Sequence, residues 1–216
     1  MKRRLLPFVS LAVLVGMLAW WGLPWCIELP PSLLAPQTPS VTYLARDGSP
    51  LRQLLTSKGD RTLALVPLIE IPDDLIKATL AAEDRRFWSH GGVDLLAVVR
   101  AVRDNLQSGR VVSGASTIHQ QLIKVSSEDA GGRTPGVKIL EALQARRLAM
   151  SWPRERILAE YLSRVSYGNL MTGCTAAASG YFNKPIKDLT LAEADSIAAY
   201  TARDTAERPW AAPRRG

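Results

Sequence analysis

Glu83 places a carboxylate on the apolar face of a predicted helix. Ile76 and Leu80 are one helical turn apart, and the same face reaches Glu83 one turn later. Burial on such a face disfavours the charged form and raises the pKa, which suits a residue that accepts a proton in catalysis. The alternative is a helix end at which Glu83 turns to solvent or pairs with Arg85 or Arg86. Periodicity alone favours this alternative.

A second set of polar side chains forms one stripe of a predicted helix. Thr117, Gln121 and Lys124 recur at i, i+4 and i+7, about 100° away from an apolar stripe. A hydroxyl, an amide and an ammonium in a row could bind phosphates or sugar hydroxyls. A solvated surface is the default alternative for such a stripe.

Lys138 and Glu141 form a third set, spaced i, i+3. A pair of this kind, taken alone, indicates only that a helix is stabilised by a few tenths of a kcal/mol. None of the three sets is decisive when it is considered by itself.

Helix signals surround these residues. Asp94 can cap a helix that ends before Gly109, and Pro153 can begin another that ends at Gly168. Thr190 is followed by a glutamate three residues later, which is a capping-box pattern for a last helix. The region beyond residue 72 is therefore predicted to be helical almost throughout.

A β-hairpin is predicted before the helical region. Apolar and polar residues alternate on both sides of Asp47-Gly48, a dipeptide that is typical of tight hairpin turns. The sequence as a whole therefore predicts a mainly α fold with a small β element.

Residues 1–27 are predicted to form a cytoplasmic tip and a transmembrane anchor. The run from Leu5 to Ile27 contains no charged side chain and is long enough to cross a bilayer as a helix. Basic residues precede the run, so the positive-inside tendency places the rest of the chain outside the inner membrane. A cleaved signal peptide is the alternative, but the run lacks a small-x-small cleavage site.

Two segments are predicted after the anchor. Residues 28–40 are rich in proline and are expected to form a stiff, extended linker. Residues 41–216 are long enough for one domain with a sizeable core, and a second catalytic domain does not fit.

The composition limits the partners and the possible metal sites. The 27 basic and 20 acidic residues give a net charge of +7, which favours an anionic partner such as a phosphorylated substrate, lipid head groups or nucleic acid. Cys26 and Cys174 are too few for a disulfide scaffold and are expected to be unpaired. Two histidines exclude a histidine-rich metal site, and no metal ligand is predicted.

Segments in the same order resemble the signatures of one family, the glycosyltransferase (transglycosylase) domain of class A penicillin-binding proteins and monofunctional peptidoglycan glycosyltransferases. The segments are 83–94, 114–124, 138–141 and 157–168, and the resemblance covers about residues 41–200. The residues shared with the first signature are Glu83, Asp84, Arg85, Phe87, His90, Gly92 and Asp94. The hairpin and Phe87-Trp88 look most like the penicillin-binding protein 1C branch. Because the chain ends at Gly216, no transpeptidase domain is expected.

This resemblance implies a lysozyme-like, mainly α glycosyltransferase domain with a small β-hairpin, preceded by one transmembrane helix. It implies lipid II as the substrate, with Glu83 deprotonating the acceptor 4-hydroxyl and Glu141 as a second carboxylate. Lys124 and Lys138 would bind the leaving diphosphate. The substrate-binding set is completed by Asp84, Phe87, His90, Thr117 and Gln121. A divalent cation is plausible in the family, although this sequence shows no ligand set for one.

The resemblance also implies partners and a location. The partners are lipid II, the growing glycan strand, the membrane and other cell-wall synthesis proteins, and no nucleic acid is expected. The location is the inner (plasma) membrane, crossed once, with the catalytic domain on the periplasmic side.

Departures from the family pattern leave alternatives open. They occur at Val137, which replaces an arginine, and at His119, Val125, Ala159 and Ser163. The final family motif is not recognisable, so the C-terminal end of the domain is expected to be truncated. An inactive lipid II-binding scaffold is therefore the main alternative to an active enzyme. A glycan-cleaving enzyme on the lysozyme fold is disfavoured, since cleavage needs no diphosphate-binding stripe.

Overall fold

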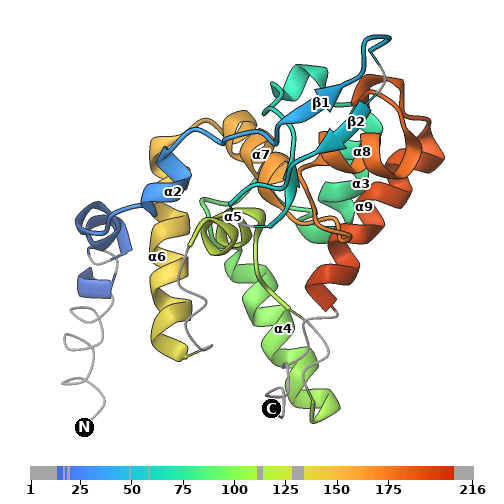
Figure 1. Cartoon of the computed structure of the whole chain (residues 1–216). Coiled ribbons are helices and arrows are strands. Elements are labelled where there is room, and N and C mark those ends of the chain that lie inside the picture. Colours follow the sequence, from blue (N-terminus) through green and yellow to red (C-terminus); the bar gives the residue numbers. More distant parts are fainter. Residues whose placement is uncertain are drawn as a thin grey trace, which may run out of the picture.

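The computed structural model describes residues 14–16, 18, 20–48, 50–57, 59–110, 114–127 and 134–206, and these are mainly helical, as predicted (Figure 1). The α-helices are α2 (Pro31–Leu34), α3 (Asp73–Glu83), α4 (Leu95–Ser108), α5 (Ile118–Ser126), α6 (Pro135–Ser151), α7 (Arg154–Arg164), α8 (Cys174–Phe182) and α9 (Leu191–Ala206). The 3-10 helices are η1 (Leu23–Cys26), η2 (Leu68–Glu70) and η3 (Ile186–Asp188). The strands are β1 (Thr42–Leu44), β2 (Pro50–Gln53), β3 (Arg61–Thr62) and β4 (Met171–Thr172).

The predicted hairpin is confirmed. Strands β1 and β2 pair in antiparallel fashion, with Thr42 opposite Gln53 and Tyr43 opposite Arg52, and Gly48 adopts a φ of 84° in the turn. Strands β3 and β4 also pair, in parallel. This second pair was not predicted, because two-residue strands are too short to show a period.

Helix α5 lies at the centre of the core. Its residues Ile118, Leu122 and Ile123 are fully buried, and the helix packs against both α6 and α7. On the α7 side, Tyr161 and Leu162 are also fully buried. A nine-residue helix is buried to this extent only when other elements pack on most of its faces. Helix α5 is therefore the central element of the domain, and the candidate site residues lie around it.

The predicted helix boundaries hold in most places. The Asp94 carboxylate accepts hydrogen bonds from two backbone N–H groups at the start of α4, and Gly109 ends the helix with a φ of 65°. The capping box of α9 is present, with the Glu193 carboxylate 2.8 Å from the Thr190 nitrogen. Helix α7 ends earlier than predicted, at Arg164, because the chain turns into a β-bridge before it reaches Gly168.

The buried face of α3 differs from the prediction by one position. Helix α3 packs along α9, and its fully buried residues are Leu75 and Thr79. Ile76 and Leu80 are half-buried. Periodicity identified an amphipathic helix, whereas the partner helix decides which of two adjacent stripes is covered.

The N-terminal region differs from the prediction in part. The predicted transmembrane helix lies partly outside the described residues, and no helix within them is both long and apolar enough to cross a membrane. The prediction of an extended linker is wrong at α2, where Pro31 begins a helical turn and Leu33 is buried. Arg164 donates to the carbonyl oxygens of Ser32 and Leu33 at 2.9 and 3.4 Å, so this segment is attached to the domain.

Candidate active site

Glu83 is the last residue of α3 and is half-buried. Its Oε2 accepts a hydrogen bond of 2.7 Å from Nε2 of Gln121 on α5. The two nearby arginines have other contacts, since Arg85 donates to a backbone carbonyl of α3 and Arg86 lies 3.6 Å from Asp94. The side chain of Glu83 is therefore held by α5, and the described contacts do not include the alternative arginine pair.

The electrostatic surroundings of Glu83 agree with the expected shift. Burial raises the pKa of Glu83 above its ordinary value, the hydrogen bond from Gln121 lowers it, and the adjacent Asp84 carboxylate raises it. Burial is the largest of these effects, so the net direction is upward, as predicted.

A tyrosine that sequence reasoning did not assign to the site completes this arrangement. Tyr161 on α7 is fully buried, and its hydroxyl donates to Oε1 of Gln121 at 3.0 Å. The Gln121 amide therefore presents its nitrogen to Glu83. Tyr161 lies in the segment 157–168, whose apolar residues follow helical spacing, so no local pattern marked a polar role for it. A buried tyrosine hydroxyl nevertheless usually has a partner.

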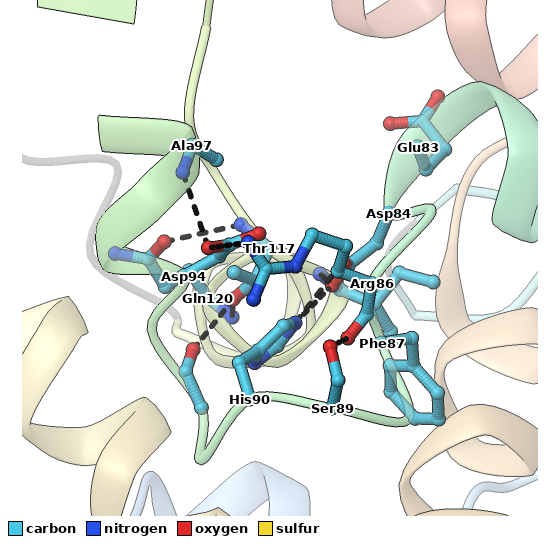
Figure 2. A network of polar contacts seen from close by, with 12 residues as sticks. Glu83, Asp84, Arg86, Phe87, Ser89, His90, Asp94, Ala97, Thr117 and Gln120 are labelled. Carbon is cyan, nitrogen blue, oxygen red and sulfur yellow. Dashed lines mark hydrogen bonds and ion pairs between the residues drawn. The ribbon is translucent and has the colours of Figure 1, made fainter. Parts of the chain in front are cut away.

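Asp84 points away from Glu83 and into the interior, so the two carboxylates diverge from the end of α3 (Figure 2). One Asp84 oxygen accepts a hydrogen bond of 3.0 Å from the backbone N–H of Ile118, the first residue of α5. His90 Nε2 lies 3.0 Å from both Asp84 oxygens. Asp84 therefore caps α5 and joins it to the loop that follows α3.

Thr117 lies immediately before α5 and caps it, rather than standing on its surface. Its hydroxyl donates to the carbonyl of Gly92 at 2.6 Å and accepts from the Gln120 backbone N–H at 3.3 Å. The Gln120 side chain accepts from the Thr117 backbone N–H in return, which completes a capping box (Figure 2). The expected polar stripe is thus divided, because the first of its three residues lies in the interior.

The basic residues lie nearer the surface. Lys138, on α6, has its ammonium 2.8 Å from Glu141 and 3.1 Å from the Ser116 hydroxyl. Lys124 is half-buried in the last turn of α5. Val137, beside Lys138, is 38% exposed, so it does not face the core.

An open groove of about 440 Å³ runs between the start of α4 and the start of α6. Residues that line it include Val93, Val98, Ser116, Gln120, Lys138 and Ile139. Gln120 lines this groove, and the next residue, Gln121, holds Glu83. Helix α5 therefore contacts the groove through Gln120 and the half-buried Glu83 carboxylate through Gln121, on faces about 100° apart.

The remaining departures from the family pattern lie inside the domain. Ala159 and Ser163 are buried on α7, and Val125 is half-buried on α5. His119 is fully buried, with its ring 5.1 Å from that of Phe87, which is also fully buried. Burial, followed by the neighbouring His90, lowers the pKa of His119 to about 3. His119 is therefore an uncharged interior residue.

Comparisons with known proteins agree with these features. The Transglycosylase family model matches residues 47–215. Penicillin-binding protein 1A of Neisseria lactamica is 38% identical over 183 residues, which cover 83% of this chain and 22% of the relative. Penicillin-binding protein 1A of Aquifex aeolicus (strain VF5) is 35% identical over 211 residues, which cover 96% of this chain and 28% of the relative. The chain thus spans only about a quarter of the length of these curated relatives.

Proposed function

This chain belongs to the transglycosylase family, and we propose that it is a peptidoglycan glycosyltransferase that polymerises lipid II into glycan strands. The observation that carries the proposal is the Glu83–Gln121 pair, a half-buried carboxylate held by α5, the same helix whose Gln120 lines the groove that contains Lys138. A carboxylate with a raised pKa suits a general base, and an ammonium suits a diphosphate.

Glu83 acts in this proposal as the general base. It accepts the proton of the acceptor sugar's 4-hydroxyl while that oxygen bonds to the anomeric carbon of the lipid-linked donor. The bond from the anomeric carbon to the diphosphate breaks, the electron pair leaves with the diphosphate, and the configuration at the carbon is inverted. General-base assistance of this kind contributes roughly 10²- to 10⁴-fold to a rate.

Lys138 and Lys124 stabilise the departing diphosphate. Its charge increases as the bond breaks, and a cation that is already in place lowers the barrier without reorganisation. Glu141 orients Lys138 through their 2.8 Å ion pair. Because Glu141 is paired with Lys138, the described groove residues do not include a set of carboxylates that could bind a divalent cation. The proposed reaction therefore assigns no step to a divalent cation.

Asp84, Phe87, His90 and Thr117 position the reacting groups. The contacts of Asp84 and Thr117 attach the loop after α3 to the start of α5, which is the helix that carries Gln121. Phe87, a residue of the same loop, is buried in the hydrophobic core. A shift of about 1 Å in such a support can change a rate by roughly a hundredfold.

The location and domain division belong to the same proposal. Residues 1–27 form a single membrane anchor, 28–40 connect it to the domain, and 41–216 form the glycosyltransferase domain on the periplasmic side of the inner membrane. Relatives named penicillin-binding protein 1A support a place in the cell envelope. The hairpin and the Phe87-Trp88 pair support the 1C branch. Other cell-wall synthesis proteins are proposed partners.

The test is polymerisation of lipid II by the full chain purified in detergent. Formation of long glycan strands, resolved by size on a gel, is the expected result. Binding of lipid II without formation of polymer would indicate that the protein is a lipid II-binding scaffold and not an enzyme. Conversion of finished glycan into shorter products would indicate a glycan-cleaving enzyme.

A further inference from the structure

The two histidines of this chain come together in the interior, although 28 residues separate them in the sequence. The ring centroids of His90 and His119 are 5.3 Å apart, and the Asp84 carboxylate completes the cluster. All three side chains are buried, and one potential ligand atom from each lies within 4.8 Å of the others. Two imidazoles and a carboxylate thus converge at one buried point.

Ring nitrogens in this cluster lack hydrogen-bond partners. Both nitrogens of His119, and Nδ1 of His90, are buried without a partner among the described residues. A neutral imidazole always carries one N–H and one lone pair, so both functions of His119 are unsatisfied. Buried polar atoms of this kind are rare, and a bound water or ion is one of the arrangements that satisfies them.

We propose that Asp84, His90 and His119 bind one divalent transition-metal ion, of which zinc is the representative. Imidazole nitrogen and carboxylate oxygen are common zinc ligands, whereas magnesium prefers oxygen ligands and retains its water. Tetrahedral ligands about 2.1 Å from an ion lie about 3.4 Å from one another. Separations of up to 4.8 Å must therefore shorten by up to about 1.4 Å, which a movement of about 0.7 Å by each of two side chains supplies.

The surroundings of the cluster suit a structural ion. Asp84 is oriented by the Ile118 N–H, and the fully buried ring of Phe87 lies against His119. The nearby Arg154 guanidinium donates to the Phe87 carbonyl at 2.6 Å. Glu83 points in a different direction (Figure 2). The ion would fasten the loop after α3 to α5 without contacting the reacting sugars, so it would act on the proposed active site only through the positioning residues Asp84 and His90.

The test is zinc binding by the full chain, purified in detergent without a polyhistidine tag. The thiol of Cys26 is exposed and could compete, so all proteins carry Cys26→Ser. We expect one zinc ion per chain and, at a hundredfold excess over Kd, a rise of about 5 to 10 °C in Tm. Absence of binding would overturn the proposal.

Matched variants locate the ion. His119→Phe keeps an aromatic ring but removes both nitrogens, and should abolish binding. Thr79→Val removes another buried, unpartnered polar atom elsewhere and should leave binding unchanged. Binding that survives His119→Phe would overturn the proposal.

A spectroscopic measurement decides the question even if a variant does not fold. With ¹⁵N-labelled imidazoles, the two histidines produce separate ring-nitrogen signals, and zinc should shift at least one nitrogen of each ring. Unchanged signals from both rings at saturating zinc would place the ion elsewhere and overturn the proposal. This readout is independent of lipid II polymerisation, so its outcome does not depend on the proposed function.

Discussion

Glu83 and Asp84 are adjacent in the sequence, yet their carboxylates have different surroundings. Glu83 is half-buried and accepts a hydrogen bond from the side chain of Gln121. Asp84 is buried and contacts the backbone N–H of Ile118 and the ring of His90. A base must keep an oxygen available for the incoming proton, and of the two only Glu83 lies outside the interior. The difference in surroundings supports different roles for two identical functional groups.

Glu83→Gln should lower lipid II polymerisation by about 10²- to 10⁴-fold, because it removes the proton acceptor and leaves the side-chain volume nearly unchanged. Initial rates and lipid II affinity are measured together, and affinity should be largely retained. Glu141→Gln is the matched control, and its loss should be smaller because Glu141 acts through Lys138. Near-normal turnover of Glu83→Gln, with a severe loss in Glu141→Gln, would reverse the two roles.

Val137→Arg should raise polymerisation by roughly five- to thirtyfold, equivalent to about 1 to 2 kcal/mol of barrier. The new guanidinium would stand beside Lys138 and could contact the diphosphate at two points. Val137 is 38% exposed, so the arginine need not be buried. Its charge near the start of α6 should cost only about 0.3 to 1 kcal/mol of stability.

Val137→Met is the uncharged control, since it lengthens the side chain without adding a cation. Turnover and Tm are measured for both variants. A stable Val137→Arg protein with unchanged turnover would show that a missing cation is not the limitation.

Among the helices, α3, α5 and α7 meet at the proposed base. Helix α3 carries Glu83 at its end, α5 supplies Gln121, and α7 supplies the Tyr161 hydroxyl. Because an amide side chain can rotate by half a turn, a neighbour must fix which end faces the carboxylate. Packing of α7 on α5 therefore determines how the carboxylate on α3 is held.

Tyr161→Phe should lower kcat about two- to tenfold and leave KM nearly unchanged, since it removes one hydrogen bond of about 0.5 to 1.5 kcal/mol that acts through Gln121. Steady-state kinetics on lipid II provide the measurement. Tyr43→Phe, on the exposed hairpin, is the control and should be neutral. Equal kcat values for the parent and Tyr161→Phe would remove Tyr161 from the proposed arrangement.

Gly92→Ala should destabilise the contact between the loop after α3 and α6. A Cβ at this position would lie 2.4 Å from the backbone oxygen of Ala145, and the φ of Gly92 is 94°. Backbone strain and overpacking together are expected to cost about 2 to 5 kcal/mol of the free energy of unfolding.

Thermal unfolding in detergent should show a Tm about 5 to 15 °C lower for Gly92→Ala. Gly109→Ala is the control, because Gly109 also has positive φ but no atom within 4 Å of the added Cβ. Gly109→Ala should lower the free energy of unfolding by only about 1 kcal/mol, which is the cost of the backbone strain alone. Equal losses for both variants would show that the contact with α6 contributes nothing.

At the scale of the whole molecule, the N-terminal segment is held against α6, beside which it lies in Figure 1. The guanidinium of Arg146 is 4.4 Å from the ring centroid of Trp21, and that of Arg147 is 3.9 Å from the centroid of Trp25. Arg146 also donates to the carbonyl of Gly91 at 3.2 Å. The end of the predicted anchor is therefore coupled to the loop that follows the proposed base.

A reporter fused after Gly216 should be on the periplasmic side. The physical reason is that the charge-free run follows a basic cluster, which retains residues 1–4 in the cytoplasm. Alkaline phosphatase, which requires an oxidising compartment for its disulfides, should be active in this fusion. A fusion that is active only with a cytoplasmic reporter would contradict both the anchor and access to an extracytoplasmic substrate.

The sequence by itself determined the features that depend on a few neighbouring residues. Asp94 and Gly109 delimit α4, Thr190 begins the capping box of α9, and Asp47-Gly48 lies at the turn of the hairpin. Caps and turns use hydrogen bonds and backbone angles within about four residues, so their residue types can be recognised locally. The family also followed from the sequence, because its signatures are short and occur in a set order.

Only the tertiary structure decided which distant side chains meet. Gln121 reaches Glu83 across 38 positions, the hydroxyl of Thr117 turns inward to Gly92, and His119 packs against the loop that carries His90. Helical periodicity defines a face but not the neighbour that covers it, nor the hydrogen bond that orients a side chain. Those choices depend on how α3, α5, α6 and α7 pack together, which no local pattern contains.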